Sequence, residues 1–349
     1  MRERRRIRDW MEIPGRFFPG ERNAITDVPG VLVGQKTILR GESVRTGVTL
    51  IRPHEGDTYH IQTQAAVCVG NGFGKLTGSV QVGELGVCES IIGLTNTLSV
   101  PQVVQGILSY QKDWVEDEDG SMNVLVGETN DGYLNDLYGF HVAPGDVLDA
   151  IRAMGKDVEE GAVGAGAGTT CYGYKGGIGT ASRIVRGVNI GERSDYTVGV
   201  LIQTNFGGSL NVYGRQLPYK PLPEPDPAGS CMIVAATDAP MDARQLKRLA
   251  KRAILGMTYT GSYMSNGSGD FAIAFSNCPD NLSDKRDEHI RTYRRLSDPQ
   301  MNCFFEAVAE AAREAVYDSL TMAVDVTGFR GHSRKAFDIT EYADLIPLR

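Results

Sequence analysis

The sequence predicts an α/β protein in which stacked β-sheets are covered by helices. Three observations support this prediction. Several short apolar runs have the borders of buried strands, four longer segments have the spacing of helices, and the two kinds of segment cluster along the chain. Strict alternation of strands and helices would instead favour a doubly wound sheet.

Each predicted strand is a short apolar run, bordered mostly by Gly or Asn, as is typical of strands inside a protein. The predicted strands span residues 48–52, 65–69, 124–126, 196–203, 232–236 and 271–275.

Four segments predict helices, at residues 101–111, 145–154, 241–257 and 299–323. In the third helix, the apolar residues recur at helical spacing and the basic residues fall on the opposite side. Its predicted buried face consists of Leu246, Leu249, Ala250, Ala253, Ile254 and Met257, and its wet face carries Lys247, Arg248, Lys251 and Arg252.

The length of 349 residues suits two ordinary domains or one large α/β domain. Because no shift in composition marks a boundary, we predict a single domain over residues 1–349. Hydrophobic residues make up 41% of the chain and charged residues 23%, which is typical of a globular protein with a sizeable core. The net charge of −7 gives no sign of a nucleic-acid-binding surface.

The six cysteines are spread singly, without a CxxC pair, and several fall in apolar runs. This pattern predicts buried, reduced thiols rather than disulfides or a metal site.

Arginines at positions 2, 4, 5, 6 and 8 look like the start of a secretory signal peptide. The following residues 9–14 (DWMEIP) are not an apolar segment, so we expect no export by this route and a cytoplasmic location. We interpret the arginines as a solvated tail or, alternatively, as a contact with another subunit.

The most informative segment is the junction between a proline-rich loop and an apolar strand. Four prolines between residues 221 and 227 disfavour helix and sheet, so this loop is expected to be exposed and stiff. Gly229 and Ser230 follow. For the serine hydroxyl to attack the glycine carbonyl, the backbone must adopt a strained conformation. Glycine tolerates such a conformation because it has no Cβ. Cleavage there would make Ser230 a new N-terminus, whose α-amine could accept the hydroxyl proton. The alternative is an incidental Gly-Ser pair.

Several segments together resemble the DmpA family of self-processing aminopeptidases, which includes the β-peptidyl aminopeptidases. The matches run in order along nearly the whole chain, and they are specific as a set although each alone is weak. They comprise residues 23–30 (NAITDVPG), 45–49 (RTGVT), 70–75 (GNGFGK), 128–136 (ETNDGYLND), 164–168 (GAGAG), 230–250 and 267–270 (GSGD).

The resemblance implies a four-layer α/β/β/α sandwich and cleavage between Gly229 and Ser230. The products would be an α chain, residues 1–229, and a β chain, residues 230–349, with Ser230 as the catalytic nucleophile. The resemblance also implies a homo-oligomer of processed αβ heterodimers and no cofactor.

Ser268 and Asp270 open a predicted strand two residues apart, so their side chains share one face. The resemblance implies that they lie beside the nucleophile, where β-peptidyl aminopeptidases carry Ser-X-Glu. Here the acid is Asp, whose shorter side chain changes the geometry, and an Asx-type turn that starts the strand is the alternative. The strand period directs Cys231 to the face opposite Ser230, as a packing residue.

Asn205 ends an apolar strand and so reaches its rim. Amide N–H groups in such a place can stabilise the oxyanion of an acyl-transfer intermediate, and the resemblance implies this role for Asn205. The alternative is that Asn205 caps the turn into residues 206–208.

Glu128 and Tyr133 belong to a dense polar segment that follows a predicted strand. An aminopeptidase needs a carboxylate to pair with the substrate ammonium. The resemblance implies this role for Glu128, and for Tyr133 a contact that holds the intermediate. The nearby Asp131, Asn135 and Asp136 are interpreted as turn and capping residues. No metal site is predicted, because His141 and these acids lack ligand spacing.

The glycine run at residues 164–168 lacks the GxGxxG spacing, and no strand is predicted at residues 157–161 before it. It is therefore interpreted as a loop of close backbone approach rather than a nucleotide site. The five scattered histidines give little support to a Ser-His-Asp triad.

These observations predict a self-cleaving serine aminopeptidase or amidase, without cofactor or metal. It would release N-terminal residues from small peptides, amides or esters through an acyl-enzyme on Ser230. No nucleic-acid or membrane partner is expected. One alternative is an ω-amino oligomer amidase or an aminoacyl transferase on the same scaffold. The other is an unprocessed binding protein without enzymatic activity.

Overall fold

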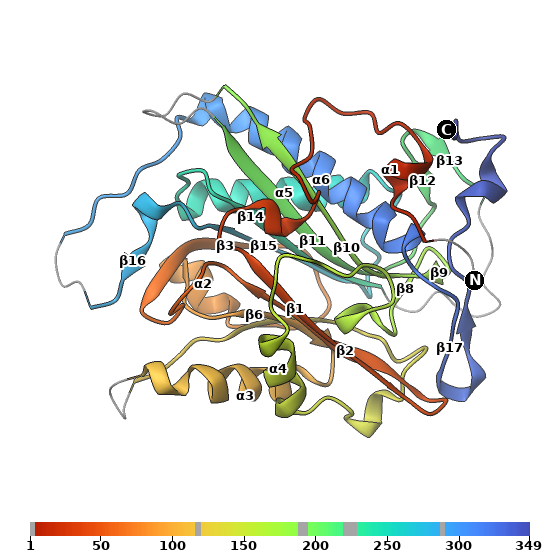
Figure 1. Ribbon diagram of the computed structural model, residues 1–349, viewed down its shortest axis with the longest axis horizontal. Helices are drawn as coiled ribbons and strands as arrows, with labels where there is room; N and C mark the ends of the chain where they lie inside the picture. The colour runs from red at the N-terminus through yellow and green to blue at the C-terminus, as the bar shows by residue number, and fades with distance from the viewer. Residues whose placement is uncertain (1–3, 116–119, 188–194, 219–228, 287–289) are drawn as a thin grey trace.

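The computed structural model describes residues 4–115, 120–187, 195–218, 229–286 and 290–349. Two β-sheets lie face to face between two layers of helices (Figure 1). The predicted α/β class and the α/β/β/α sandwich implied by the family resemblance are both confirmed. The proline-rich segment 221–228 and Arg2 lie outside the described residues.

The larger sheet has the strand order β10-β11-β14-β15-β3-β16, and β5 also pairs with β3. Its central pair, β14 and β15, runs parallel, whereas β11 and β3 flank that pair in antiparallel orientation. The strands are β3 (Ile61–Gly72), β5 (Val87–Cys88), β10 (Gly177–Val185), β11 (Tyr196–Asn205), β14 (Ser230–Thr237), β15 (Gly269–Ser276) and β16 (Ser283–Asp284).

The smaller sheet has the order β1-β2-β6-β7-β4, in which β6 and β7 run parallel and therefore end at the same edge. Its strands are β1 (Leu32–Arg40), β2 (Val44–Arg52), β4 (Leu76–Thr77), β6 (Ile92–Asn96) and β7 (Leu125–Thr129). Three two-stranded ribbons complete the β-structure that is described: β8 (Thr170–Cys171) with β9 (Tyr174–Lys175), β12 (Asn211–Val212) with β13 (Arg215–Gln216), and β17 (Val326–Thr327) with β18 (Ser333–Arg334).

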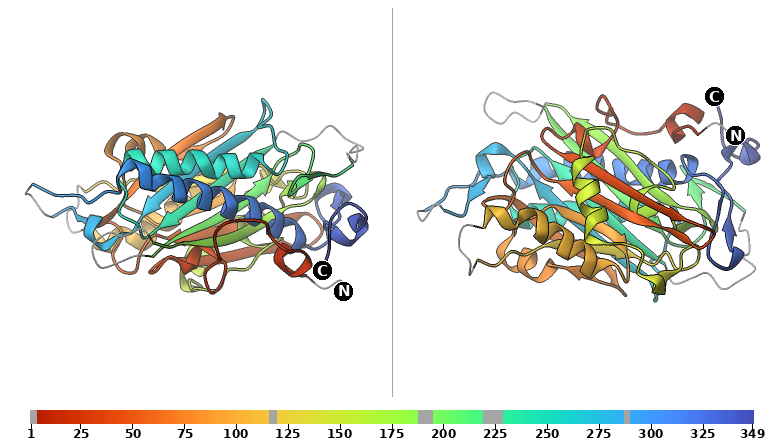
Figure 2. Two further views of the ribbon diagram at one scale, coloured as in Figure 1. Left: turned by 90° about the horizontal axis from the view of Figure 1, so that it is seen from above. Right: turned by 60° about the horizontal axis from the view of Figure 1, so that its bottom comes forward.

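The helices form the two outer layers, as the further views in Figure 2 also show. Two long helices, α5 (Ala243–Thr258) and α6 (Met301–Thr321), cover the larger sheet, and α3 (Val100–Gln111) and α4 (Pro144–Arg152) cover the smaller one. The short helices are α1 (Ile7–Trp10) and α2 (Ser79–Leu85). All four predicted helices and all six predicted strands are present, with ends shifted by a few residues.

The core shows why the central strands are apolar on both faces. Along β14, Cys231 and Ile233 pack toward α5 and α6, whereas Met232 and Val234 pack into the layer between the sheets. A third apolar cluster fills the space under α3 and α4. The alternation also confirms that Cys231 is a buried packing residue. All six cysteines are free thiols, and four of them are buried.

The interpretation of the N-terminal arginines as a solvated tail is wrong for Arg6 and Arg8. Arg6 Nε lies 2.5 Å from Glu160 Oε2, and Arg8 Nη2 lies 2.7 Å from Glu314 Oε2. Both acids are buried, and Glu314 also pairs with the buried Arg183 of β10. These ion pairs fix the N-terminal segment to the body of the protein.

The segments before and after position 229 are interleaved in the larger sheet. Strand β14 lies between β11 and β15, so it pairs on one side with a strand from the earlier segment and on the other with one from the later segment. Of the helices within the described ranges, none is long and apolar enough to cross a membrane.

Candidate active site

Ser230 is the first residue of β14 and is buried, with 5% of its surface exposed. In the strand register it lies opposite Asn205, the last residue of β11, and opposite Gly269, the first residue of β15. The predicted nucleophile and the predicted oxyanion donor are therefore neighbours at one edge of the larger sheet. The apolar run after Ser230 fixes this placement, because it must be buried on both faces.

Asn205 contacts the hydroxyl of Ser230 directly. Its Nδ2 donates to Ser230 Oγ at 3.2 Å and to the carbonyl oxygen of Asn130 at 2.9 Å. Its Oδ1 accepts a hydrogen bond from the backbone N–H of Thr170 at 3.0 Å. Because this last bond fixes which way the amide faces, the NH₂ group points at Ser230. Asn205 is thus not occupied with capping the turn that follows it.

A second donor to Ser230 comes from the other sheet. The backbone N–H of Asn130, just after β7, lies 3.3 Å from Ser230 Oγ. Strand β7 approaches β14 closely at Gly127, where an added Cβ would lie 2.2 Å from Met232 Cε and 2.7 Å from its Sδ. Two N–H groups therefore face the Ser230 oxygen, an arrangement that stabilises negative charge on or near it.

Glu128 lines the same pocket as Ser230. The pocket has a volume of about 370 Å³, and its walls are formed by Gly72, Phe73, Gly74, Lys75, Thr97, Glu128, Asn130, Gly229, Ser230 and Gly267. Glu128 is 4% exposed, and its Oε1 accepts a hydrogen bond from the backbone N–H of Lys75 at 2.9 Å. Lys75 Nζ lies 3.4 Å from the same oxygen and donates to Thr97 Oγ1 at 2.6 Å. The pocket thus offers a buried carboxylate beside a serine hydroxyl.

Ser268 lies beside the predicted cleavage position, and neither Ser268 nor Asp270 lines the pocket. A Cβ added to Gly229 would lie 3.2 Å from Ser268 Oγ, and the N–H of Gly269 donates to the Gly229 carbonyl at 3.1 Å. Asp270 lies in register with Cys231, and burial raises its pKa to about 6. The nearby Ser268 hydroxyl lowers the pKa of Asp270 and so offsets part of this rise. The Ser268 hydroxyl and the Asp270 carboxylate nevertheless do not have the geometry of an ordinary hydrogen bond.

Tyr133 lies in a separate aromatic and cationic contact. Its ring stacks on His332 with centroids 4.5 Å apart, and the guanidinium carbon of Arg334 lies 3.7 Å from the ring centroid. Arg334 Nη1 also donates to the Tyr133 hydroxyl. Tyr133 does not line the pocket around Ser230. In this arrangement it does not contact the predicted nucleophile.

The glycine run forms a loop of close backbone approach, as predicted. An added Cβ at Gly166 would lie 2.6 Å from the backbone of Gly177, and one at Gly168 would lie 2.1 Å from the Arg45 carbonyl oxygen. Gly164 has a φ of +51°, which L-residues with a side chain rarely adopt. The loop leads directly into β8, which carries the Thr170 N–H that holds Asn205.

Sequence reasoning missed Asn130, Lys75 and Thr97. Asn130 acts through its backbone N–H, which no side-chain pattern reveals. Lys75 lies in segment 70–75, which contributes to the family resemblance but predicts no individual role for Lys75. The signal that could have found Lys75 is its charge, because a buried carboxylate such as Glu128 needs a cation nearby.

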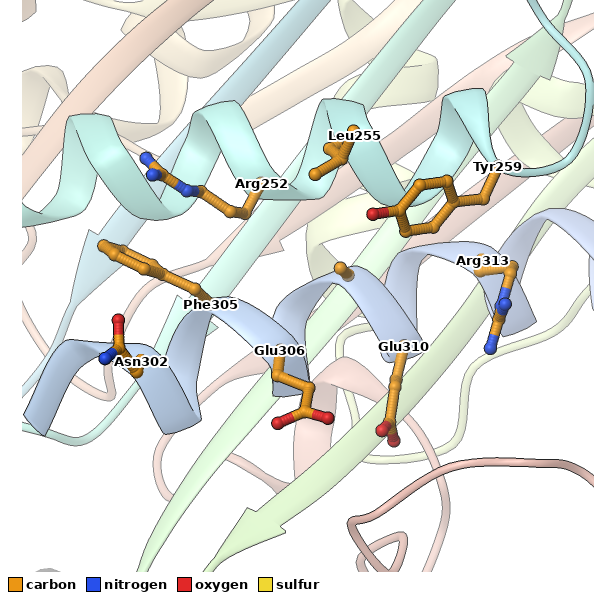
Figure 3. Close-up of a pocket in the computed structure, with 9 residues that line it drawn as sticks. Arg252, Leu255, Tyr259, Asn302, Phe305, Glu306, Glu310 and Arg313 are labelled. Carbon is orange, nitrogen blue, oxygen red and sulfur yellow. The ribbon is translucent and has the colours of Figure 1, made fainter.

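A second pocket of about 490 Å³ lies between α5 and α6 on the outer face of the molecule (Figure 3). Arg252, Leu255 and Tyr259 line it from α5, and Phe305, Glu306 and Arg313 from α6. None of the predicted site residues takes part in it. Over the described ranges, no three His, Cys, Asp or Glu side chains gather as they would around a metal ion.

The α/β/β/α sandwich presents a serine hydroxyl to two N–H donors in a pocket with a buried carboxylate, an arrangement suited to acyl transfer. Comparison with known families identifies the class as that of the aminopeptidases. Residues 23–334 match peptidase family S58, and the chain belongs to that family.

Curated and solved relatives share nearly the full length of the chain. Beta-peptidyl aminopeptidase BapA of Sphingosinicella microcystinivorans is 39% identical over 94% of this chain and 88% of the relative. The PH0078 protein from Pyrococcus horikoshii OT3 is 42% identical, covers 96% of this chain and 97% of its own, and superposes with a TM-score of 0.89.

The L-aminopeptidase D-Ala-esterase/amidase from Ochrobactrum anthropi is 32% identical, covers 98% of this chain and 99% of its own, and also gives a TM-score of 0.89. That enzyme is described as a prototype for the serine aminopeptidases and as a variant of the Ntn hydrolase fold.

Proposed function

We propose that this chain is a self-cleaving serine aminopeptidase whose nucleophile is Ser230. The observation that carries the proposal is the environment of the Ser230 hydroxyl. Its oxygen receives the Asn205 amide and the Asn130 N–H, in a pocket that also holds the Glu128 carboxylate. The beta-peptidyl aminopeptidase activity of one relative and the L-aminopeptidase activity of another support this reading.

In the proposed self-cleavage, Ser230 Oγ attacks the Gly229 carbonyl carbon. The Gly229 oxygen already accepts a hydrogen bond from the Gly269 N–H, which would stabilise the developing negative charge. The peptide bond breaks, its nitrogen gains a proton, and the resulting ester is hydrolysed. Chain 1–229 and chain 230–349 result, and Ser230 gains a free α-amine, with Ser268 close to the bond that breaks.

In the proposed peptidase reaction, the substrate ammonium pairs with Glu128 and its first carbonyl lies at Ser230. The Ser230 α-amine takes the hydroxyl proton as Oγ attacks, and the Asn205 amide donates to the oxyanion. The leaving amine departs with a proton, and water then hydrolyses the acyl-enzyme. Substrates would be small peptides, amides or esters with a free amino terminus.

The experiment that tests the proposal is the intact mass of freshly purified protein under denaturing conditions, beside the Ser230→Ala variant. Self-cleavage converts the 37.9 kDa chain into pieces of roughly 25 and 13 kDa, scaled by length. The variant should remain whole. A wild-type chain of full mass, inactive on aminoacyl anilides, would refute the enzyme and favour a binding protein. Light scattering on the cut protein tests the further proposal that the αβ units form a homo-oligomer.

A further inference from the structure

Lys175 is a fully buried cation close to the candidate active site that the proposed reaction does not use. Its side chain has no exposed surface, and its Nζ donates to the carbonyl oxygens of Gly166 at 2.8 Å and Gly176 at 2.7 Å. Burial lowers the pKa of Lys175 to about 7, and the charge of Asp131 opposes that shift. A buried ammonium is costly unless it is paired or hydrogen-bonded, so its position calls for a physical reason.

The two carbonyls that Lys175 holds belong to the backbone around the β8–β9 hairpin. In that hairpin, Lys175 lies in register with Thr170. The Thr170 N–H is the group that fixes Asn205 Oδ1, and through it the direction of the Asn205 NH₂ group toward Ser230. Lys175 thus lies directly across the hairpin from Thr170, the residue whose N–H orients the Asn205 amide.

Asp131, whose charge opposes the pKa shift of Lys175, is next in the chain to Asn130, whose backbone N–H is the second donor to Ser230. Asn130 contacts both Ser230 Oγ and the Asn205 amide. Asp131 is 1% exposed. Its Oδ1 accepts from Asn135 Nδ2 at 3.0 Å, and its Oδ2 has no hydrogen-bond partner among the described residues. Burial also raises the pKa of Asp131 to about 7. Two buried ionisable groups, Lys175 and Asp131, are therefore connected through the backbone to the two groups that donate to Ser230.

We propose that Lys175 is a positioning residue of the Ser230 site. It holds the β8–β9 hairpin so that Thr170 keeps the Asn205 amide turned toward Ser230, and the buried Asp131 is its ionisable partner beside Asn130. This inference rests on the proposed peptidase function. It adds a residue that touches neither substrate nor nucleophile and that governs the catalytic step through Asn205.

The test is Lys175→Met, which keeps the length of the side chain but removes the charge and the donors. Lys36→Met, at an exposed ion pair with Asp149, is the matched control. With L-, D- and β-alanine p-nitroanilides as probes, Lys175→Met should lower kcat about tenfold or more at nearly unchanged KM, because small misplacements of reacting groups cost that much. Hydrogen exchange of the peptide covering residues 166–176 should also become faster. Lys36→Met should change neither quantity.

A lower melting temperature with unchanged kcat would overturn the proposal, since it would make Lys175 merely structural. Unchanged hydrogen exchange would overturn it as well. If wild-type protein hydrolyses none of the anilides, the proposed function fails, and the exchange measurement still decides whether Lys175 holds the hairpin. If Lys175→Met does not fold, the isosteric Asp131→Asn decides: a lower kcat at unchanged KM supports the pair, and an unchanged kcat refutes it.

Discussion

Replacing Asn205 with Ala provides the sharpest test of the proposed chemistry. The substitution removes the amide that donates to Ser230 Oγ at 3.2 Å, and we expect β11 to keep its fold, because its backbone pairing with β10 and β14 is unchanged. Loss of one oxyanion donor lowers kcat by about 100- to 1000-fold, equivalent to about 2.7–4 kcal/mol. We therefore expect a kcat loss of this size with little change in KM, because the donor acts mainly on the transition state.

The stability cost of the same substitution also follows from the structure. Asn205 makes three hydrogen bonds, to Thr170, Asn130 and Ser230. At about 1 kcal/mol for each bond, their loss should lower the free energy of unfolding by about 3 kcal/mol. Asn277 is a matched control, because it is similarly buried and its Nδ2 donates to the Pro29 and Pro53 carbonyls, beyond the other end of β15. Asn277→Ala should lose about 2 kcal/mol and keep its kcat.

The assay is the release of p-nitroaniline from alanine p-nitroanilides, with kcat expressed per cleaved chain as determined by intact mass. Thermal melting of both variants reports the stability cost. If Asn205→Ala keeps kcat within about fivefold of wild type, the oxyanion role of Asn205 is refuted, since that loss is far below the cost of a lost donor. If Asn277→Ala loses kcat as well, the effect comes from stability rather than from chemistry.

Three further predictions concern Glu128, Asp270 and Arg183. Glu128→Gln should lower kcat/KM about 10- to 100-fold for substrates with a free amine, because a hydrogen bond to a charged group contributes about 1.5–3 kcal/mol. Equal kcat/KM values for the wild type and Glu128→Gln would contradict this prediction. Burial raises the pKa of Asp270 in the folded protein from 3.8 to about 6. Between these two pH values the unfolded chain loses the proton more readily than the folded protein, so the free energy of unfolding falls as the pH rises from 3.8 to about 6. Asp270→Asn should therefore raise the melting temperature at pH 7 and leave it unchanged below pH 3.8. Arg183 forms buried ion pairs with Glu310 at 3.0 Å and Glu314 at 2.6 Å. Arg183→Met leaves both carboxylates without this partner, so it should lower the free energy of unfolding by about 3–5 kcal/mol. Urea unfolding in the uncut Ser230→Ala background measures this loss.

The sequence predicted the central strands well because burial on both faces leaves a continuous apolar run. The predicted strand 232–236 is β14, which extends from Ser230 to Thr237, and the predicted strand 271–275 is β15. Strand β10 escaped prediction because it packs under α6 with small and polar residues. An added Cβ at Gly179 would lie 1.8 Å from the Ala315 carbonyl oxygen, and Arg183 points into the buried ion pairs. Hydrophobic pattern alone cannot identify such a strand.

The candidate site was predictable where side chains carry the chemistry and hidden where the backbone does. Ser230, Asn205 and Glu128 were predicted from their residue types together with the family resemblance, and the structure brings all three to one place. The Asn130 N–H depends on how closely two sheets approach, which the sequence does not encode locally. The same limit explains the arginine interpretation, because Glu160 and Glu314, the partners of Arg6 and Arg8, lie far away in the chain.

The central position of β14 has a consequence for how the cut protein would be inactivated by unfolding. A cut before Ser230 leaves two polypeptides whose strands share one ladder, so unfolding would release two molecules instead of one flexible chain. Refolding would then become a bimolecular encounter that slows with dilution, whereas the uncut precursor can refold alone. Self-cleavage would thus turn a reversible equilibrium into a one-way loss, and the working lifetime of the mature enzyme would be set by its rate of unfolding.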